Sequence, residues 1–197
     1  MAPTRRSKAK NCIIEIVPPK DDPNAPTVTY VKHTRSTTDN GVTEAVQELI
    51  PKISEESTAR PILEFLNTFR EARHTFAWTN GQKLFLHFRQ HLLPGPREAW
   101  DEAIEDMNQT IANFEAALIT FKNNRLTNYN YHDQMDYIRD FQKPPGLSPT
   151  RYLTYLRANL RVTMQLPGAP AVGPGEPALG VSDHALKRLF YKAMPPT

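Results

Sequence analysis

Residues 137–160 have the sequence YIRDFQKPPGLSPTRYLTYLRANL, which joins a proline-rich segment to the start of a helix. The Pro-Pro-Gly run at 144–146 cannot lie inside a helix, because proline lacks an amide hydrogen and clashes with the preceding turn. Ser148 can accept a hydrogen bond from the free amides of the next helix, and Pro149 fits its first turn. The stretch therefore predicts a turn followed by a helix that begins at Ser148-Pro149.

The helix after this turn is expected to bury one broad apolar face. Large side chains recur there three or four residues apart, the spacing of a single helix face. They are Tyr152, Leu153, Tyr155, Leu156, Leu160, Thr163 and Met164. A helix with this pattern needs a partner surface, so we expect it to form part of a hydrophobic core.

Most of the remaining chain also has apolar residues at helical spacing. The predicted helices cover residues 43–53 (interrupted by Pro51), 61–80, 84–92, 96–107, 110–121, 133–141 and 182–194. No internal repeat is visible, and the predicted fold class is all-α. A chain of 197 residues can bury one substantial core or two small helical lobes.

Residues 1–42 are predicted to be a disordered basic arm. The first 40 residues hold seven Lys/Arg and four Asp/Glu, so they carry the whole net charge of +3. Two β-prone pieces, Ile13–Val17 and Val28–Val31, are too short to fold alone. Addition of one piece to a partner as a strand stays open.

The sequence shows no recognisable catalytic motif, and we expect no enzyme activity, cofactor or small-molecule substrate. His87 and His91 have the spacing of two metal ligands, but Phe88 stands where a metalloprotease needs Glu. We expect partly exposed helical histidines and no metal site. The acidic residues at 98–106 lie opposite Trp100, as on a solvated helix face. The single cysteine, Cys12, excludes a disulfide or a cysteine-based zinc knuckle within the chain.

Two groups of basic residues are candidates for binding nucleic acid. The first contains Arg5, Arg6, Lys8 and Lys10, without an acidic residue among the first ten positions; the alternative is a solubilising or nuclear-targeting tail. In the second, Arg157 and Arg161 share one helix face. The alternative there is an ordinary solvated face on which arginines meet carboxylates.

The chain has no apolar run close to the roughly 20 residues that span a bilayer. Its basic N-terminus is not followed by the apolar core of a signal peptide. We therefore expect an intracellular protein without a membrane partner, located in the cytoplasm, with the nucleus as the alternative.

From about Phe65 to Pro196, some two thirds of its length, the chain resembles the Gag capsid region of long-terminal-repeat retrotransposons. The order and spacing of the matching residues carry the resemblance. They are Trp100, Phe114, Phe121, Tyr137-Ile138-Arg139, Gln142-Lys143-Pro144, Ser148, Arg151-Tyr152, Leu156, Leu160, Leu166-Pro167-Gly168, Leu186–Phe190 and Met194-Pro195.

The resemblance implies a bilobed helical capsid protein that self-assembles into virus-like particles enclosing the element's RNA. Its lobes would cover residues 43–143 and 144–197. Gln142 and Ser148 would fix the turn between them by bonding backbone groups, while Tyr152, Leu156 and Leu160 would form the core of the second lobe. RNA would bind mainly through the basic arm.

Two departures from the family pattern qualify this expectation. The downstream Cys-Cys-His-Cys zinc knuckle is missing, and the chain stops just after Met194-Pro195-Pro196, where such regions usually continue. We therefore expect either a fragment or a degraded element. The rival interpretations are a nucleic-acid-binding protein that forms no shell, and a cellular adaptor domesticated from a Gag ancestor that binds proteins through helical grooves.

Overall fold

The computed structural model describes residues 13–18, 28–39, 42–171 and 179–195. The described chain is mostly helical with one two-stranded sheet, and its contacts divide it into two compact units. We call residues 24–125 the hairpin unit, and residues 1–23 together with 126–197 the C-terminal unit. The sequence predicted a boundary after Lys143, whereas this division falls after Arg125.

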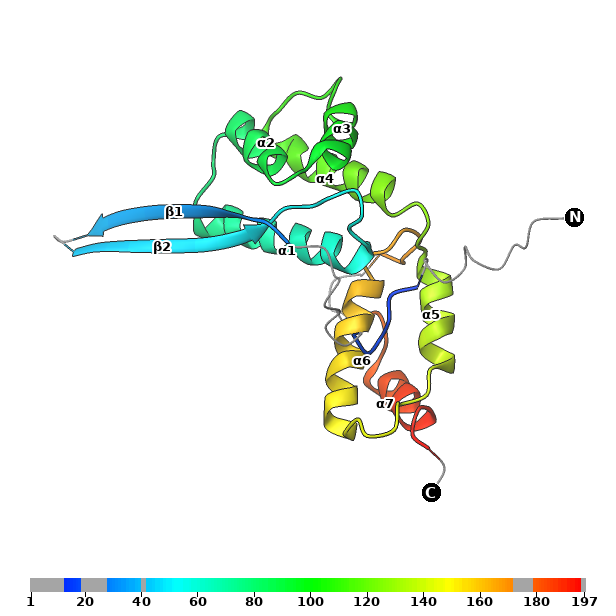
Figure 1. The fold of residues 1–197 in the computed structure, drawn as a ribbon. Helices are drawn as coiled ribbons and strands as arrows, with labels where there is room; N and C mark the ends of the chain where they lie inside the picture. Colours follow the sequence, from blue (N-terminus) through cyan, green and yellow to red (C-terminus); the bar gives the residue numbers. More distant parts are fainter. Residues whose placement is uncertain (1–12, 19–27, 40–41, 172–178, 196–197) are drawn as a thin grey trace, which may run out of the picture. The chain divides into compact units, whose positions relative to one another are not determined.

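The hairpin unit contains two strands and four helices (Figure 1). They are β1 (Tyr30–Asp39), β2 (Val42–Pro51), α1 (Ala59–Thr75), α2 (Gly81–Gln90), α3 (Pro94–Ala103) and α4 (Ile111–Arg125). The strands are antiparallel, with Tyr30 opposite Pro51 and Asp39 opposite Val42.

The all-α prediction is therefore wrong for residues 30–51. A helix was expected from the spacing of Val46, Leu49 and Ile50, but these residues lie on β2. Leu49 is 61% exposed whereas Ile50 is fully buried, as alternation along a strand requires. Pairing with β1 satisfies the backbone groups that a helix would have satisfied internally. The expected disorder of residues 1–42 is likewise wrong for the part that forms β1.

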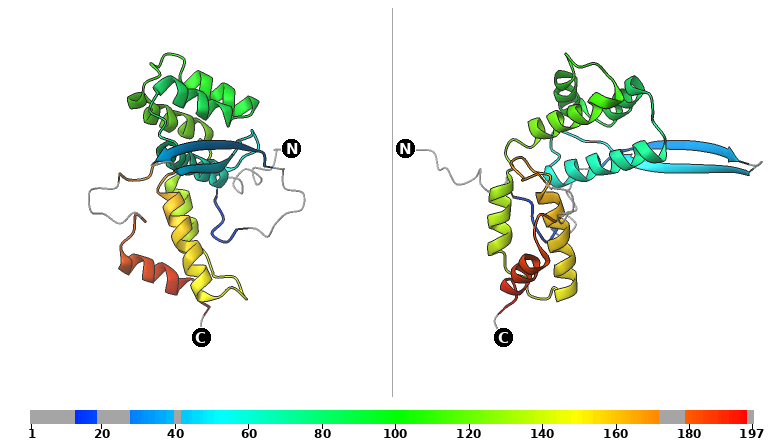
Figure 2. Two further views of the ribbon diagram at one scale, coloured as in Figure 1. Left: turned by 90° about the vertical axis from the view of Figure 1, so that its left-hand side faces the viewer. Right: turned by 180° about the vertical axis from the view of Figure 1, so that it is seen from behind.

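The hairpin has one partly covered face and one open face. Val31, His33 and Ile50 lie on the face that is partly or fully buried, and α1 contacts β2. Tyr30 and Leu49 lie on the opposite face and are 55% and 61% exposed. The two strands extend well past the helices of their own unit (Figures 1 and 2). Most of this hairpin is therefore surface.

The helices of the hairpin unit enclose an aromatic core centred on Phe88. The Phe88 side chain is fully buried. Its ring centroid lies 4.3 to 6.0 Å from five other aromatic rings, those of Phe65, Phe69, Trp100, Phe114 and Phe121. Rings from α1, α2, α3 and α4 thus meet at one point, which the spacing of aromatic residues in the sequence predicted helix by helix.

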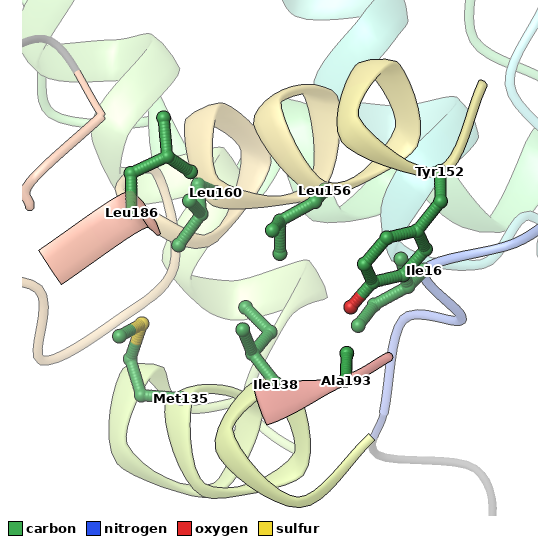
Figure 3. Packing of buried hydrophobic residues seen from close by; sticks show 8 residues of the cluster. All are labelled: Ile16, Met135, Ile138, Tyr152, Leu156, Leu160, Leu186 and Ala193. Atoms are coloured by element: carbon green, nitrogen blue, oxygen red, sulfur yellow. The ribbon is translucent and has the colours of Figure 1, made fainter. Parts of the chain in front are cut away.

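The C-terminal unit consists of α5 (Tyr131–Asp140), α6 (Pro149–Thr163), α7 (Asp183–Lys192) and the segment 13–18. Its core is shown in Figure 3 and contains Ile16, Met135, Ile138, Tyr152, Leu156, Leu160, Leu186 and Ala193. Tyr152, Leu156 and Leu160 have no exposed surface, so the apolar face predicted for α6 is the buried one.

Short polar side chains set where several helices begin. Ser148 Oγ accepts from the Arg151 amide (3.3 Å) at the start of α6, and Ser182 Oγ accepts from the Ala185 amide (3.2 Å) at the start of α7. Both starts were predicted from the sequence. Capping of this kind typically contributes about 1 kcal/mol, because it satisfies amides that the helix leaves unpaired.

Candidate functional site

An N-terminal segment lies between two helices of the C-terminal unit. Residues 13–18 run between α5 and α6, drawn in dark blue in Figure 1. Ile14 is 5% exposed and Ile16 is 1% exposed. The prediction of disorder is wrong for these residues. A piece too short to fold alone is ordered here because its partner is another part of the chain.

Two buried carboxamides hold the backbone of this segment. Gln134 Oε1 accepts from the Ile14 amide (2.8 Å), and Gln134 Nε2 donates to the Ile14 carbonyl (2.7 Å). Asn159 Nδ2 donates to the carbonyls of Ile14 (3.1 Å) and Glu15 (3.2 Å). Gln134 Nε2 also donates to Asn159 Oδ1 (3.0 Å), which joins α5 to α6. We call Gln134 and Asn159 the amide pair.

The side chain between the two buried isoleucines is also recognised. Tyr137 Oη donates to the Glu15 carboxylate over 2.6 Å. Burial raises the pKa of the Tyr137 hydroxyl, and the hydrogen bond to Glu15 raises it further, so the phenol keeps its proton to donate. Together Gln134, Tyr137 and Asn159 form what we call the segment site. It binds backbone and side chain of the same short peptide.

Of the two residues expected to fix the turn before α6, Ser148 bonds a backbone amide, whereas Gln142 does not. The Gln142 side chain is exposed and makes no hydrogen bond within the described part of the chain. Lys143 Nζ instead donates to the carbonyls of Pro144 (3.1 Å) and Leu147 (2.7 Å), and the Lys143 amide donates to the Ala193 carbonyl (2.9 Å). Gly146 allows the turn because its φ of +81° is a conformation that other residues seldom adopt.

One hydroxyl in this core lacks a partner. Tyr152 Oη is buried without a hydrogen bond from any described group, and burial raises its pKa to about 12. Figure 3 shows this oxygen beside Ile16. An unpaired buried hydroxyl costs about 1–3 kcal/mol, so the apolar packing around Tyr152 has to outweigh that cost.

The arginines on α6 are exposed. Arg157 and Arg161 make no ion pair with any described carboxylate, so the alternative of arginines that meet carboxylates on this face is not seen. Arg151 donates to Tyr155 Oη (3.0 Å) and lies over the Tyr155 ring. The other basic candidates, Arg5, Arg6, Lys8 and Lys10, lie outside the described residues.

A cleft of about 500 Å³ lies between α5 and α7. Four of its five charged groups form ion pairs: Arg139 with Asp136 (2.8 Å), and Lys192 with Asp140 (3.2 Å). The fifth, Arg188, has no ion pair with a described carboxylate. Met135, Val181 and Leu189 supply apolar surface. The lining thus has three basic and two acidic side chains, and four of these five charges neutralise one another in pairs.

Three histidines of the hairpin unit lie close together, His33 on β1 and His87 and His91 at the end of α2. His33 Nε2 lies 2.9 Å from His91 Nε2, and the His33 ring centroid lies 5.7 Å from that of His87. The expectation of partly exposed helical histidines is wrong for His91, which has no exposed surface. No three such ligands among the described residues are arranged to hold a metal ion. We call His33, His87 and His91 the histidine cluster.

The histidine cluster is expected to weaken the hairpin unit in acid. Burial, then the neighbouring His33, lower the pKa of His91 to about 4, and burial lowers the pKa of His33. Because the pKa of His91 is lower in the folded state than in the unfolded state, protonation favours the unfolded state. Stability is therefore complete above about pH 6.5 and falls as the pH drops towards 4, by about 2–3 kcal/mol for His91. The hydrogen bond between His33 and His91 also requires one Nε2 without a proton to accept. It is lost when both imidazoles are protonated, because both Nε2 atoms are then donors.

Urea unfolding at pH 7.5 and pH 4.5 measures this effect. Both tryptophans, Trp78 and Trp100, lie in the hairpin unit, so their fluorescence reports on that unit alone. His91→Gln should reduce the pH dependence, whereas the matched control His184→Gln, at an exposed residue of α7, should not. An unchanged pH dependence in His91→Gln would show that other groups cause the loss.

No protein-family model, curated protein or solved structure matches the chain. Within the described residues, no helix combines the length and the hydrophobicity needed to cross a bilayer.

Proposed function

We propose that this chain is a structural, Gag-like capsid protein that self-associates into particles enclosing RNA. The proposal begins from the family resemblance of residues 65–196. It is supported by a surface suited to contacts between copies, the exposed hairpin of β1 and β2. The two compact units supply separate helical bodies, each with its own apolar core.

The exposed hairpin is the observation that carries the proposal. In the described chain the sheet has only two strands, so β1 and β2 each leave one edge without a strand partner. Such edges can pair with another chain through backbone hydrogen bonds. Tyr30, Val46 and Leu49 add apolar surface, with 55%, 41% and 61% of their area exposed. A long hairpin with open edges and apolar side chains suits repeated protein contacts.

RNA would be held by basic residues outside this contact surface. Arg157 and Arg161 are exposed and without ion pairs to described carboxylates, so their charge is available to phosphates. Residues 41–197 are neutral overall, with seventeen basic and seventeen acidic residues, so many copies can pack without strong mutual repulsion. A neutral body with a few exposed arginines favours a shell in which RNA is bound at particular basic sites.

Light scattering after size exclusion, combined with electron microscopy with and without RNA, tests the function. We expect particles, and expect RNA to increase their yield. A chain that never exceeds a dimer at high concentration would contradict the proposal. A monomer that binds RNA in a salt-sensitive way would favour a nucleic-acid-binding protein, and a monomer indifferent to RNA would favour the adaptor.

Leu49→Glu is expected to abolish particle formation while leaving the fold intact. The new carboxylate would stand opposite Lys32 on β1, an arrangement that supports the hairpin while making its open face charged. Ile119→Glu is the matched control, because Ile119 is 46% exposed on α4, away from the strands. Particle counts by microscopy measure the effect. Normal assembly of Leu49→Glu would remove the hairpin's open face from the contact surface.

A further inference from the structure

The segment 13–18 is bound as a peptide ligand would be. Its hydrogen bonds to the amide pair join residues separated by 120 and 145 positions in the sequence. The whole hairpin unit, residues 24–125, lies between the segment and its site along the chain. The site is therefore built by α5 and α6 and filled by a remote piece of the chain.

The segment site is shaped for an extended backbone. Gln134 and Asn159 have no exposed surface, and the segment receives most of their hydrogen bonds. Without a peptide in place, these buried carboxamides would lose those partners, and buried polar groups without partners destabilise a fold. Two buried amides directed at one backbone are a recognition device, because they bind the groups that every peptide carries.

Side-chain contacts add sequence preference to this backbone recognition. Ile16 packs in the core cluster of the C-terminal unit, and Ile14 is buried beside the amide pair. Glu15 accepts from Tyr137 Oη over 2.6 Å. The site thus selects a short peptide in which a glutamate stands between two branched apolar residues.

We propose that the segment site is an exchangeable peptide-binding site, and that residues 13–18 of a second copy bind it in trans. On the segment side, all the hydrogen bonds described above are made by Ile14 and Glu15. Every copy of the chain carries these two residues, so a second copy can make the same bonds. The choice between cis and trans then depends on the tethered segment's effective concentration against that of other copies. The inference rests on the proposed function in one respect: self-association brings copies to the high local concentration that favours exchange.

Two complementary full-length variants test the exchange. The segment variant, Ile14→Asp with Ile16→Asp, keeps its site and loses its ligand. The site variant, Gln134→Met with Asn159→Leu, keeps its ligand, and its site becomes apolar with little change in volume. Each variant alone should be unable to form this contact with itself. Mixed in equal amounts at low concentration, they should form a one-to-one heterodimer in light scattering.

A labelled synthetic peptide of residues 11–19 gives an independent measurement. Fluorescence anisotropy should show binding to the segment variant, and the site variant should bind roughly 100-fold more weakly or worse, because several hydrogen bonds are lost together. A peptide with Glu15→Gln should bind about tenfold more weakly through the loss of the charged partner of Tyr137. If the segment variant is unfolded, the peptide should restore its helical circular dichroism.

Each result decides the proposal. Failure of the segment variant to bind the peptide or to be refolded by it would overturn the exchangeable site. Peptide binding without a heterodimer would overturn the second copy as partner. Loss of particles with an intact heterodimer would instead count against the proposed function, so the two failures are distinguishable.

Discussion

Leu156→Asp is expected to unfold the C-terminal unit and leave the hairpin unit folded. Leu156 has no exposed surface and lies in a core of apolar side chains from α5, α6, α7 and the segment 13–18. A carboxylate placed there would be buried without a partner. We expect a loss of about 4 kcal/mol or more, a large part of the roughly 5–15 kcal/mol that stabilises a typical protein.

The two tryptophans make this outcome measurable. Circular dichroism should show a loss of helix, while the fluorescence of Trp78 and Trp100 should keep its native spectrum, because both belong to the hairpin unit. Thr154→Asp is the matched control on the exposed face of the same helix, and it should change stability little. Retention of native helix content in Leu156→Asp would show that the face of α6 containing Leu156 is not the buried one.

Phe88→Ala is expected to destabilise the hairpin unit and leave the C-terminal unit folded. The mutation removes a fully buried ring that contacts five others, and large-to-small changes of this kind cost about 3–5 kcal/mol. The Trp100 ring centroid lies 4.3 Å from that of Phe88, so tryptophan fluorescence should respond directly. Urea unfolding followed by this signal should shift to a lower midpoint.

The control for Phe88→Ala lies on the same helix. Leu86 is 53% exposed, and Leu86→Ala should change stability by no more than about 0.5 kcal/mol. Equal effects of the two substitutions would contradict the aromatic core. Hydrogen exchange should also keep the amides of α5 and α6 protected in Phe88→Ala, because these helices have a separate core.

Helix positions could be predicted wherever the sequence carries its own start and stop signals. Ser148-Pro149 and Ser182-Asp183 are side-chain caps followed by apolar residues at helical spacing, and both helices begin there. The aromatic core of the hairpin unit was also predictable as separate apolar faces. Such signals act within one turn of helix, so they can be read without knowing the rest of the fold.

The spacing of Val46, Leu49, Ile50 and Ile53 imitates a helix face and obscures a turn signal that indicates the hairpin. Asn40-Gly41 stands between two segments rich in β-branched residues, a combination that indicates a two-residue hairpin connection. Leu49 contributed to the apparent helical face although 61% of its area is exposed. The turn chemistry was the better guide.

The segment site could not have been found from periodicity alone. Its contacts join positions more than a hundred residues apart, and a hydrophobic pattern identifies a buried face but not its partner. One local signal was present. Asn159 stands on the apolar face of α6 between Leu156 and Leu160, and a polar residue in such a place implies a buried hydrogen-bond partner. Here that partner is the peptide backbone of Ile14 and Glu15.

During synthesis, the segment 13–18 is made long before the helix α6 that helps to bind it. Ile14 leaves the ribosome early, but Asn159, which holds its carbonyl, is added 145 residues later. At roughly 5–20 residues per second, that interval lasts about 7–30 s. The hairpin unit is complete well before then and can fold first. During this interval a nascent chain exposes Ile14 and Ile16, because the segment site that buries them is not yet complete. Nascent chains on neighbouring ribosomes can therefore expose these two residues at the same time.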